Sequence, residues 1–335
     1  MGFMRNIFSI FLVTLVLVTS GDALAQERNS DEALLVVPRM TEGAREVPPA
    51  FNQGIEAYRE KDYSSALSYW QSLADADFGP ALHNLGVLYE YGRGVPTDYV
   101  RAAEYYDRAS EHDIAESLNN LARLYARGHG VEQDAEKAAD YLEAAADLDS
   151  PAAQFNLGVA YLKGQGVDVD EAEAARLFEA AAGAGYGPAQ YNLAGLYHRG
   201  RGVKRDLSQA LYWFGLAAET GDPLAHYGAG MILASGDGIK PDLKRAVHHI
   251  RLAANAGVLA AQNQLAIMYA RGSGVAASPE TALMWFHVAA SLGNERAEKN
   301  RDVFAKSQTV EIRKRAQERA RNFRPTTKGL IAKHD

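Results

Sequence analysis

The amino-acid sequence predicts an all-α solenoid of antiparallel helix pairs, and three observations favour this fold class. A Gly-x-Gly motif followed by Val or Ile recurs six times at a constant spacing of 36 residues. Between the motifs, apolar residues recur at helical spacing, and a helix-capping residue recurs at one fixed position. The glycine pairs are Gly92 and Gly94, Gly128 and Gly130, Gly164 and Gly166, Gly200 and Gly202, Gly236 and Gly238, and Gly272 and Gly274. A period of roughly 20 to 50 residues is typical of stacked-repeat solenoids.

The first helix of each unit ends at this glycine pair. In the first full unit, Ala81, Leu85, Leu88 and Tyr89 form one apolar stripe at helical spacing. A small residue follows the Leu position in every copy: Gly86, Ala122, Gly158, Ala194, Gly230 and Ala266. Because glycine inside a helix costs roughly 0.5–1 kcal/mol relative to alanine, its recurrence predicts that a neighbouring helix comes close at this position.

The second helix of each unit begins at a residue whose short side chain carries an oxygen. These predicted N-caps are Asp98, Asp134, Asp170, Asp206, Asp242 and Ser278. Each is expected to contribute about 0.5–2 kcal/mol by accepting a hydrogen bond from a free N–H at the helix start. An alanine then recurs at the position of Ala102, where we expect the tightest helix contact. Each unit is therefore a pair of antiparallel helices, too small to hold a core alone.

These repeats divide the chain into six parts. Residues 1–25 are predicted to be a signal peptide and residues 26–50 a flexible lead-in. Residues 51–80 form a capping unit without a glycine loop, and residues 81–296 form the six repeats. Residues 297–323 form C-terminal capping helices, in which Ser307 is expected to cap a final basic helix, and residues 324–335 form a tail. Terminal units differ from the rest because one of their faces has no neighbour.

The N-terminus has the pattern of a secretory signal peptide. Arg5 supplies the positive charge, Ile7 to Val18 is apolar, and Ala23-Leu24-Ala25 matches an A-x-A cleavage site. The apolar core would span roughly 18 Å as a helix, less than the roughly 30 Å of a bilayer interior. We expect cleavage after Ala25 and a periplasmic or secreted protein without an integral membrane segment in the mature chain. An uncleaved membrane anchor is the alternative.

The lead-in contains one apolar cluster, Leu34-Leu35-Val36-Val37, within a charged and proline-containing stretch. One interpretation is a short segment that packs on the first helices. The other is a docking peptide for a partner. The sequence alone leaves both open.

The repeat resembles the Sel1-like repeat family, which is related to the tetratricopeptide repeat. The matching pattern is A-x-x-x-L-G/A-x-x-Y-x-x-G-x-G-V, then D-x-x-x-A, an aromatic pair and A-A-x-x-G. The resemblance covers Ala81 to about Phe323, and residues 51–80 look more like a plain tetratricopeptide repeat. It implies a right-handed α-solenoid that binds other proteins, in envelope regulation, signalling or host interaction.

No catalytic constellation is present in the sequence. There is no S-x-x-K, H-E-x-x-H or G-x-S-x-G motif, and no cysteine. His248 and His249 are adjacent, so they point about 100° apart on a helix and cannot together hold one metal ion. The net charge of -7 argues against a nucleic-acid partner. We therefore expect a protein that is not an enzyme and has no cofactor or metal.

Side-chain amides recur at one position of the first helix and form the candidate partner-binding site. These residues are Asn84, Asn120, Asn156, Asn192 and Gln264, with Gly228 interrupting the series. A carboxamide offers one acceptor and two donors, so such a series would hold a peptide by its backbone along the concave groove. The alternative is that the amides tie adjacent repeats together. A second series, Arg127, Lys163, Arg199 and Arg271, would offset the negative end of each helix dipole or attract an acidic partner.

Two functions from different classes follow from these patterns. The first is a non-enzymatic scaffold or regulator that binds a partner protein of the cell envelope, such as a signalling receptor or a virulence or exopolysaccharide factor. The second is a glycan- or cell-wall-binding factor, or an enzyme acting there. In that case Phe155, Tyr191 and Tyr227, which precede the amide position, would be exposed aromatics in the groove.

Overall fold

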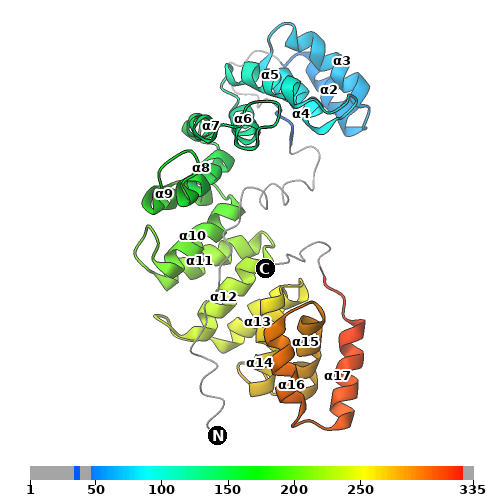
Figure 1. The fold of residues 1–335 in the computed structure, drawn as a ribbon, viewed down its shortest axis with the longest axis vertical. Helices are drawn as coiled ribbons and strands as arrows, with labels where there is room; N and C mark the ends of the chain where they lie inside the picture. The colour runs from blue at the N-terminus through cyan, green and yellow to red at the C-terminus, as the bar shows by residue number, and fades with distance from the viewer. Residues whose placement is uncertain (1–33, 38–46, 327–335) are drawn as a thin grey trace. The chain divides into compact units, whose positions relative to one another are not determined.

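The computed structural model describes residues 34–37 and 47–326, which form two compact units (Figure 1). Of the described residues, one unit contains 34–37, 47–189 and 201–203, and the other contains 190–200 and 204–326. The first unit holds α2 (Pro49–Arg59), α3 (Tyr63–Ala74), α4 (Gly79–Tyr91), α5 (Tyr99–Ser110), α6 (Ala115–Arg127), α7 (Ala135–Asp147), α8 (Pro151–Lys163) and α9 (Glu171–Gly183). Most of α10 (Gly187–Arg199) belongs to the second unit, with α11 (Leu207–Glu219), α12 (Pro223–Ser235), α13 (Leu243–Asn255), α14 (Leu259–Arg271), α15 (Pro279–Ser291), α16 (Glu295–Ala305) and α17 (Val310–Asn322).

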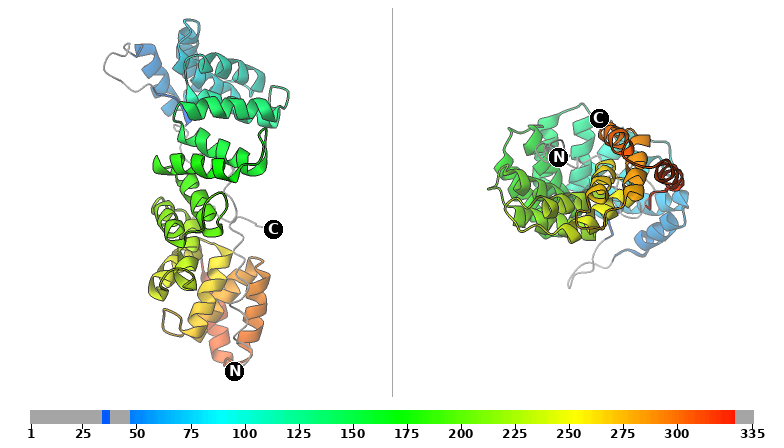
Figure 2. Two further views of the ribbon diagram at one scale, coloured as in Figure 1. Left: turned by 90° about the vertical axis from the view of Figure 1, so that its left-hand side faces the viewer. Right: turned by 90° about the horizontal axis from the view of Figure 1, so that it is seen from below.

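The predicted all-α repeat solenoid is confirmed. The described residues contain 16 α-helices and no strand. Within each unit, successive helices pair and each pair packs against the next one along the chain (Figure 2). No helix of the described residues is long and apolar enough to cross a membrane.

The recurring small residue of the first helix lies against a large side chain of the second. A Cβ on Gly86 would lie 2.5 Å from the Tyr106 ring, and one on Gly158 would lie 2.7 Å from the Phe178 ring. Both distances are too short for real contacts. The predicted close approach is therefore confirmed, and it occurs within a repeat, between its own two helices.

The two glycines of each loop have different roles. The first ends the helix in the left-handed conformation, as Gly92 does with a φ of 65°. The second lies against the preceding repeat, because a Cβ on Gly94 would approach the backbone of Tyr63 to 2.9 Å. The second glycines at 130, 166, 202 and 274 meet the preceding second helix in the same way. Gly238 is different, since its nearest such atom is a Leu207 methyl carbon at 3.8 Å.

The predicted N-caps of the second helices are confirmed in all six repeats. The side chains of Asp98, Asp134, Asp170, Asp206, Asp242 and Ser278 each accept a hydrogen bond from a backbone N–H in the first turn. The N–H of the cap residue also donates to the end of the first helix, as from Asp98 to the Tyr89 carbonyl at 2.9 Å. These bonds fix the loop at both ends.

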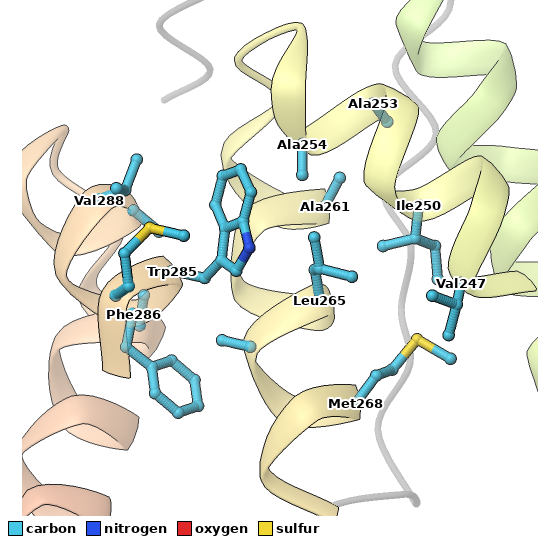
Figure 3. Packing of buried hydrophobic residues seen from close by; sticks show 14 of the residues in the cluster. Val247, Ile250, Ala253, Ala254, Ala261, Leu265, Met268, Trp285, Phe286 and Val288 are labelled. Carbon is cyan, nitrogen blue, oxygen red and sulfur yellow. The ribbon is translucent and has the colours of Figure 1, made fainter. Parts of the chain in front are cut away.

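The C-terminal core gathers around α13, α14 and α15. Figure 3 shows Trp285 pointing from α15 toward Ala261 and Leu265 of α14. The last helix, α17, closes this core with Ala316 and lies beside α15, where Phe323 contacts the Trp285 ring at 5.0 Å.

The N-cap of α17 differs from the sequence expectation. Thr309 caps the helix by accepting from the Ile312 N–H at 3.3 Å, whereas the Ser307 hydroxyl donates back to the Phe304 carbonyl. The expectation for Ser307 is therefore wrong. Ser307 sits in the turn after α16, where its hydroxyl satisfies a carbonyl at the end of that helix.

Candidate partner-binding site

The lead-in cluster lies on α4, where the Asn84 side chain holds its backbone. The Val36 N–H donates to the Asn84 Oδ1 at 2.9 Å, and the Asn84 Nδ2 donates to the Val36 carbonyl at 3.3 Å. One carboxamide therefore satisfies both main-chain groups of one residue. Asn84 is fully buried, so its amide is fixed in place by its surroundings. Of the two interpretations of this cluster, packing on the first helices is confirmed.

His83 makes a third main-chain contact, to the residue two positions earlier. Its Nε2 lies 3.1 Å from the Leu34 carbonyl, and its Nδ1 lies 2.7 Å from the Ser117 hydroxyl oxygen. Because a carbonyl only accepts, the Nε2 carries the proton, and the neutral ring accepts from Ser117 at Nδ1. Burial lowers the pKa of His83, which favours this neutral form.

Apolar contacts complete the attachment of the lead-in. Leu34 and Leu35 are half-buried against a cluster from α4, α5 and α6 that includes Val87, Tyr106 and Leu121. Val37 is 48% exposed and leaves the contact. The chain bends at Leu35, and Val36 and Val37 have no regular secondary structure, so this segment is not helical where Asn84 holds it.

A buried ion pair lies near this contact and links α4 to α6. Two nitrogens of Arg123 reach the Glu90 carboxylate, at 2.5 and 2.7 Å, and the Tyr106 hydroxyl donates to the same carboxylate at 2.9 Å. Their side chains are only 13% exposed for Arg123 and 4% for Glu90. Burial works to lower the pKa of Arg123, but the Glu90 carboxylate outweighs it, so the pKa is raised. Burial first, and then Glu90, raises the pKa of Tyr106 well above its usual value.

The next two amides of the series have other partners. Asn120 on α6 accepts from Arg123 at 3.3 Å. Asn156 on α8 donates to Asn119 of the preceding repeat at 2.8 Å. A bond of the same kind joins Asn300 to Asn263. Asn156 therefore ties adjacent repeats together, whereas Asn84 holds the backbone of a segment of the same chain. Binding of a partner peptide by this series stays a prediction.

A cavity of about 390 Å³ lies between these helices in the first unit. Its lining includes Asn119 and Arg123 of α6, Leu142 of α7, and Asn156 and Val159 of α8. It adjoins the amide series one repeat beyond the lead-in contact. This space is polar at its amides and apolar at its alanines and Leu142.

The remaining predicted site residues lie mostly inside the protein. Phe155 is fully buried against Phe178 and Tyr186, and Tyr191 is buried against Phe214. The expectation of exposed groove aromatics is wrong at these two positions, because each ring fills the space between helices. Tyr227 is half-buried, and burial raises its pKa to about 12. Asn192 and Gln264 are buried.

Sequence reasoning missed the polar set around the lead-in contact: Glu90, Ser117 and Arg123. A usable signal was present, since each breaks the repeat. Ser117 occupies the position of an alanine in the other copies, and Arg123 stands where Val87 and Val159 stand. A polar residue at a position that is otherwise apolar indicates a contact specific to one repeat.

Histidines meet at one place in the second unit. The Nδ1 atoms of His226 on α12 and His249 on α13 are 3.0 Å apart. Burial, and then the charges of His226, His248 and Arg245, lower the pKa of His249 to about 4. Among the described residues, no group of three or more His, Cys, Asp or Glu side chains is placed to bind a metal ion.

Comparison with known proteins identifies the family. A family model described as the Sel1 repeat matches residues 50–78, 79–113, 115–150, 151–186, 187–222, 223–258 and 259–294. The chain belongs to the Sel1 repeat family. The Sel1 model also matches residues 50–78, where the sequence resembles a plain tetratricopeptide repeat. Sel1 repeats generally mediate protein–protein interactions, and such scaffolds are generally not enzymes.

Other Sel1 repeat chains share this architecture. A Sel1 repeat protein from Oxalobacter formigenes has a TM-score of 0.62 and 27% sequence identity, covering 72% of this chain and 97% of that one. DAP3-binding cell death enhancer 1 from Rattus norvegicus is 44% identical over 50 residues, which is 15% of this chain and 10% of the relative. The protein of the same name from Mus musculus is 42% identical over 45 residues. This chain therefore spans about a tenth of the length of these two relatives.

Proposed function

We propose that this Sel1 repeat protein is an exported bacterial scaffold that binds a segment of a cell-envelope protein on the faces of its first helices. The observation that carries the proposal is the contact of Asn84 with the backbone of Val36. It places a polypeptide main chain against the amide position of a first helix. The stacked repeats present the same helix face several times, which suits an elongated partner segment.

The polar network beneath this face supports a binding role over a purely structural one. Glu90 is buried and the Arg123 side chain is only 13% exposed, at a position where Val87 and Val159 stand in other repeats. A buried ion pair contributes little net stability, so such a pair is better explained by the specificity of a surface than by fold stability. A glycan-binding function has less support, because Phe155 and Tyr191 are buried.

Site-specific photo-cross-linking in the native bacterium tests the binding proposal. A photoreactive residue at Asn120, on the α6 face, should give a discrete adduct with one envelope protein. The matched control places the same residue at Glu143, which is exposed on the second helix α7. Identical adducts from both positions would show that the first-helix face has no special role.

Export is tested separately from binding. Mass spectrometry of the mature protein should find Gln26 as the first residue, in a periplasmic or secreted fraction. An Ala23→Asp/Ala25→Tyr variant should keep the unprocessed length, because bulky and charged residues block an A-x-A site. Recovery of the wild-type chain in the cytoplasm with residues 1–25 attached would refute export.

A further inference from the structure

The segment Leu34–Val37 contacts the rest of the protein as a bound peptide would. Both main-chain groups of Val36 and the carbonyl of Leu34 are taken by side chains of α4, across a separation of 48 or 49 residues in sequence. We propose that this face is a recognition site for a short apolar segment, that residues 34–37 are its built-in occupant, and that a partner segment of the same chemistry must displace them. This inference names the partner chemistry of the proposed function and rests on it. We call the face formed by His83, Asn84, Val87, Leu121 and Leu124 the lead-in site.

The contacts define what the lead-in site accepts. Asn84 bonds only the main-chain N–H and carbonyl of the residue at the Val36 position. Proline is therefore excluded at this position, but many other side chains are allowed. His83 requires a carbonyl two residues earlier. The apolar cluster to which Val87, Leu121 and Leu124 belong takes two adjacent aliphatic side chains, as Leu34 and Leu35 provide. The matching partner is therefore a non-helical segment of the type Leu-Leu-x, where x carries a free N–H.

The lead-in site is preorganised for its occupant. Asn84 and His83 have relative exposures of 0% and 1%, and the Ser117 hydroxyl fixes the ring of His83. These exposures hold with residues 34–37 in place. If the occupant leaves, the donor and acceptor of Asn84 lose both main-chain partners until water or another main chain replaces them. An unpaired buried amide is unfavourable, so the site favours replacement of one main chain by another.

The occupant itself is weakly attached. Its attachment consists of three main-chain hydrogen bonds and side chains that are only half-buried, with Val37 largely exposed. Ordering four residues opposes these contacts through lost conformational entropy. What keeps the segment in place is its covalent link to the site, which gives it a high effective concentration. A partner that adds contacts along α6 and α8 would overcome this advantage.

The test uses the full mature chain and a labelled peptide of residues 30–41. In the wild-type chain the lead-in site is occupied, so the peptide should bind weakly. A released variant, Leu35→Asp/Val36→Pro, removes one aliphatic contact and the N–H that Asn84 accepts. Fluorescence anisotropy should show at least tenfold tighter binding of the peptide to the released variant.

Matched variants identify the site of binding. Adding Asn84→Ala to the released variant should weaken peptide binding at least tenfold. Adding Glu143→Ala should change it less than twofold, because Glu143 is exposed on α7, outside the lead-in site. Equal binding of the peptide by wild-type and released chains, or no effect of Asn84→Ala, would overturn the proposal.

A measurement on the wild-type fold guards against misfolded variants. In hydrogen exchange, the Val36 amide should be protected in the wild-type chain and at least tenfold less protected after Asn84→Ala. Rapid exchange of Val36 in the wild type would overturn the proposal without any released variant. Failure of these tests would leave partner cross-linking at Asn120 untouched, whereas failure of cross-linking would leave peptide binding intact, so the two proposals fail separately.

Discussion

The buried pair of Glu90 and Arg123 allows a prediction whose size follows from the structure. In Glu90→Gln the side-chain shape is kept, and the Tyr106 hydroxyl keeps an acceptor. The guanidinium of Arg123, however, stays charged at 13% exposure without its counter-charge. Removing one partner of a buried pair typically costs about 3–5 kcal/mol, because the remaining charge is desolvated and unpaired. Arg123 keeps a little access to water and the Asn120 oxygen at 3.3 Å, so we expect about 3 kcal/mol.

The assay is urea unfolding followed by circular dichroism, with the free energy of unfolding taken from the midpoint and the slope. Two controls accompany Glu90→Gln. The double variant Glu90→Gln/Arg123→Met removes both charges and should recover most of the loss. Glu173→Gln breaks a pair with Arg176 that is 66% exposed on the arginine side, and should cost less than about 0.5 kcal/mol. A loss below about 1 kcal/mol for Glu90→Gln, or no recovery in the double variant, would refute the reasoning.

Three further predictions concern the repeat and the histidine pair. Asp170→Ala removes a cap that accepts two backbone N–H groups and should lower the free energy of unfolding by about 1 kcal/mol in the urea assay. Gly166→Ala combines a φ of 76° with a Cβ that overlaps the Ala135 carbonyl, and should lower it by about 2 kcal/mol or more. The pKa of His249 is about 4, below the unfolded value of 6.5, so its contribution is complete above pH 6.5 and is lost as the pH falls toward 4. We expect the wild type to lose about 1 kcal/mol more unfolding free energy than His249→Tyr between pH 7 and pH 4.5, a value discounted for the half-exposed ring. Urea unfolding at the two pH values measures this, and an equal loss in both proteins would contradict the assignment.

The repeated features of the fold could be predicted because each is local and occurs several times. The N-cap position follows from one residue type at one spacing, and the structure places all six side chains on backbone N–H groups. The close contact at Gly86 follows from the cost of glycine in a helix. Which helix packs against this position could not be predicted, because a small residue indicates a close contact but not which helix makes it. Here the neighbour is Tyr106 of the same repeat.

The second glycine of each loop cannot be explained from the sequence of a single repeat. The first glycine of the Gly-x-Gly pair is enough to reverse the chain. The second member is required by the backbone of the preceding repeat, a contact between residues about 31 positions apart, as for Gly94 and Tyr63. Such a requirement is visible only when neighbouring repeats are stacked. At Gly238, where the preceding helix stands away, glycine is still required by its φ of 71°.

The sequence predicts the type of side chain at the candidate site, but not which residues make which contacts. The amide series predicts that a carboxamide on the first helix can hold a main chain, and Asn84 holds the main chain of Val36 from the same protein, whereas binding of a partner stays a prediction. The same position serves a different contact at Asn156, because its neighbour Asn119 is also an amide and lies within reach. The rings of Phe155 and Tyr191 gave a misleading signal, since aromatic residues fill cores as readily as they bind ligands.

Departures from the repeat are the better guide to function in this chain. Residues that recur in all copies make the contacts that recur in all copies, namely caps, loops and the packing of paired helices. Glu90, Ser117 and Arg123 serve none of these contacts. Ser117 holds the His83 ring that contacts the segment, and Arg123 pairs with Glu90. Burying a charged pair costs desolvation that apolar residues would avoid. The repeat that buries the ion pair of Glu90 with Arg123 is also the one whose Asn84 holds a polypeptide segment.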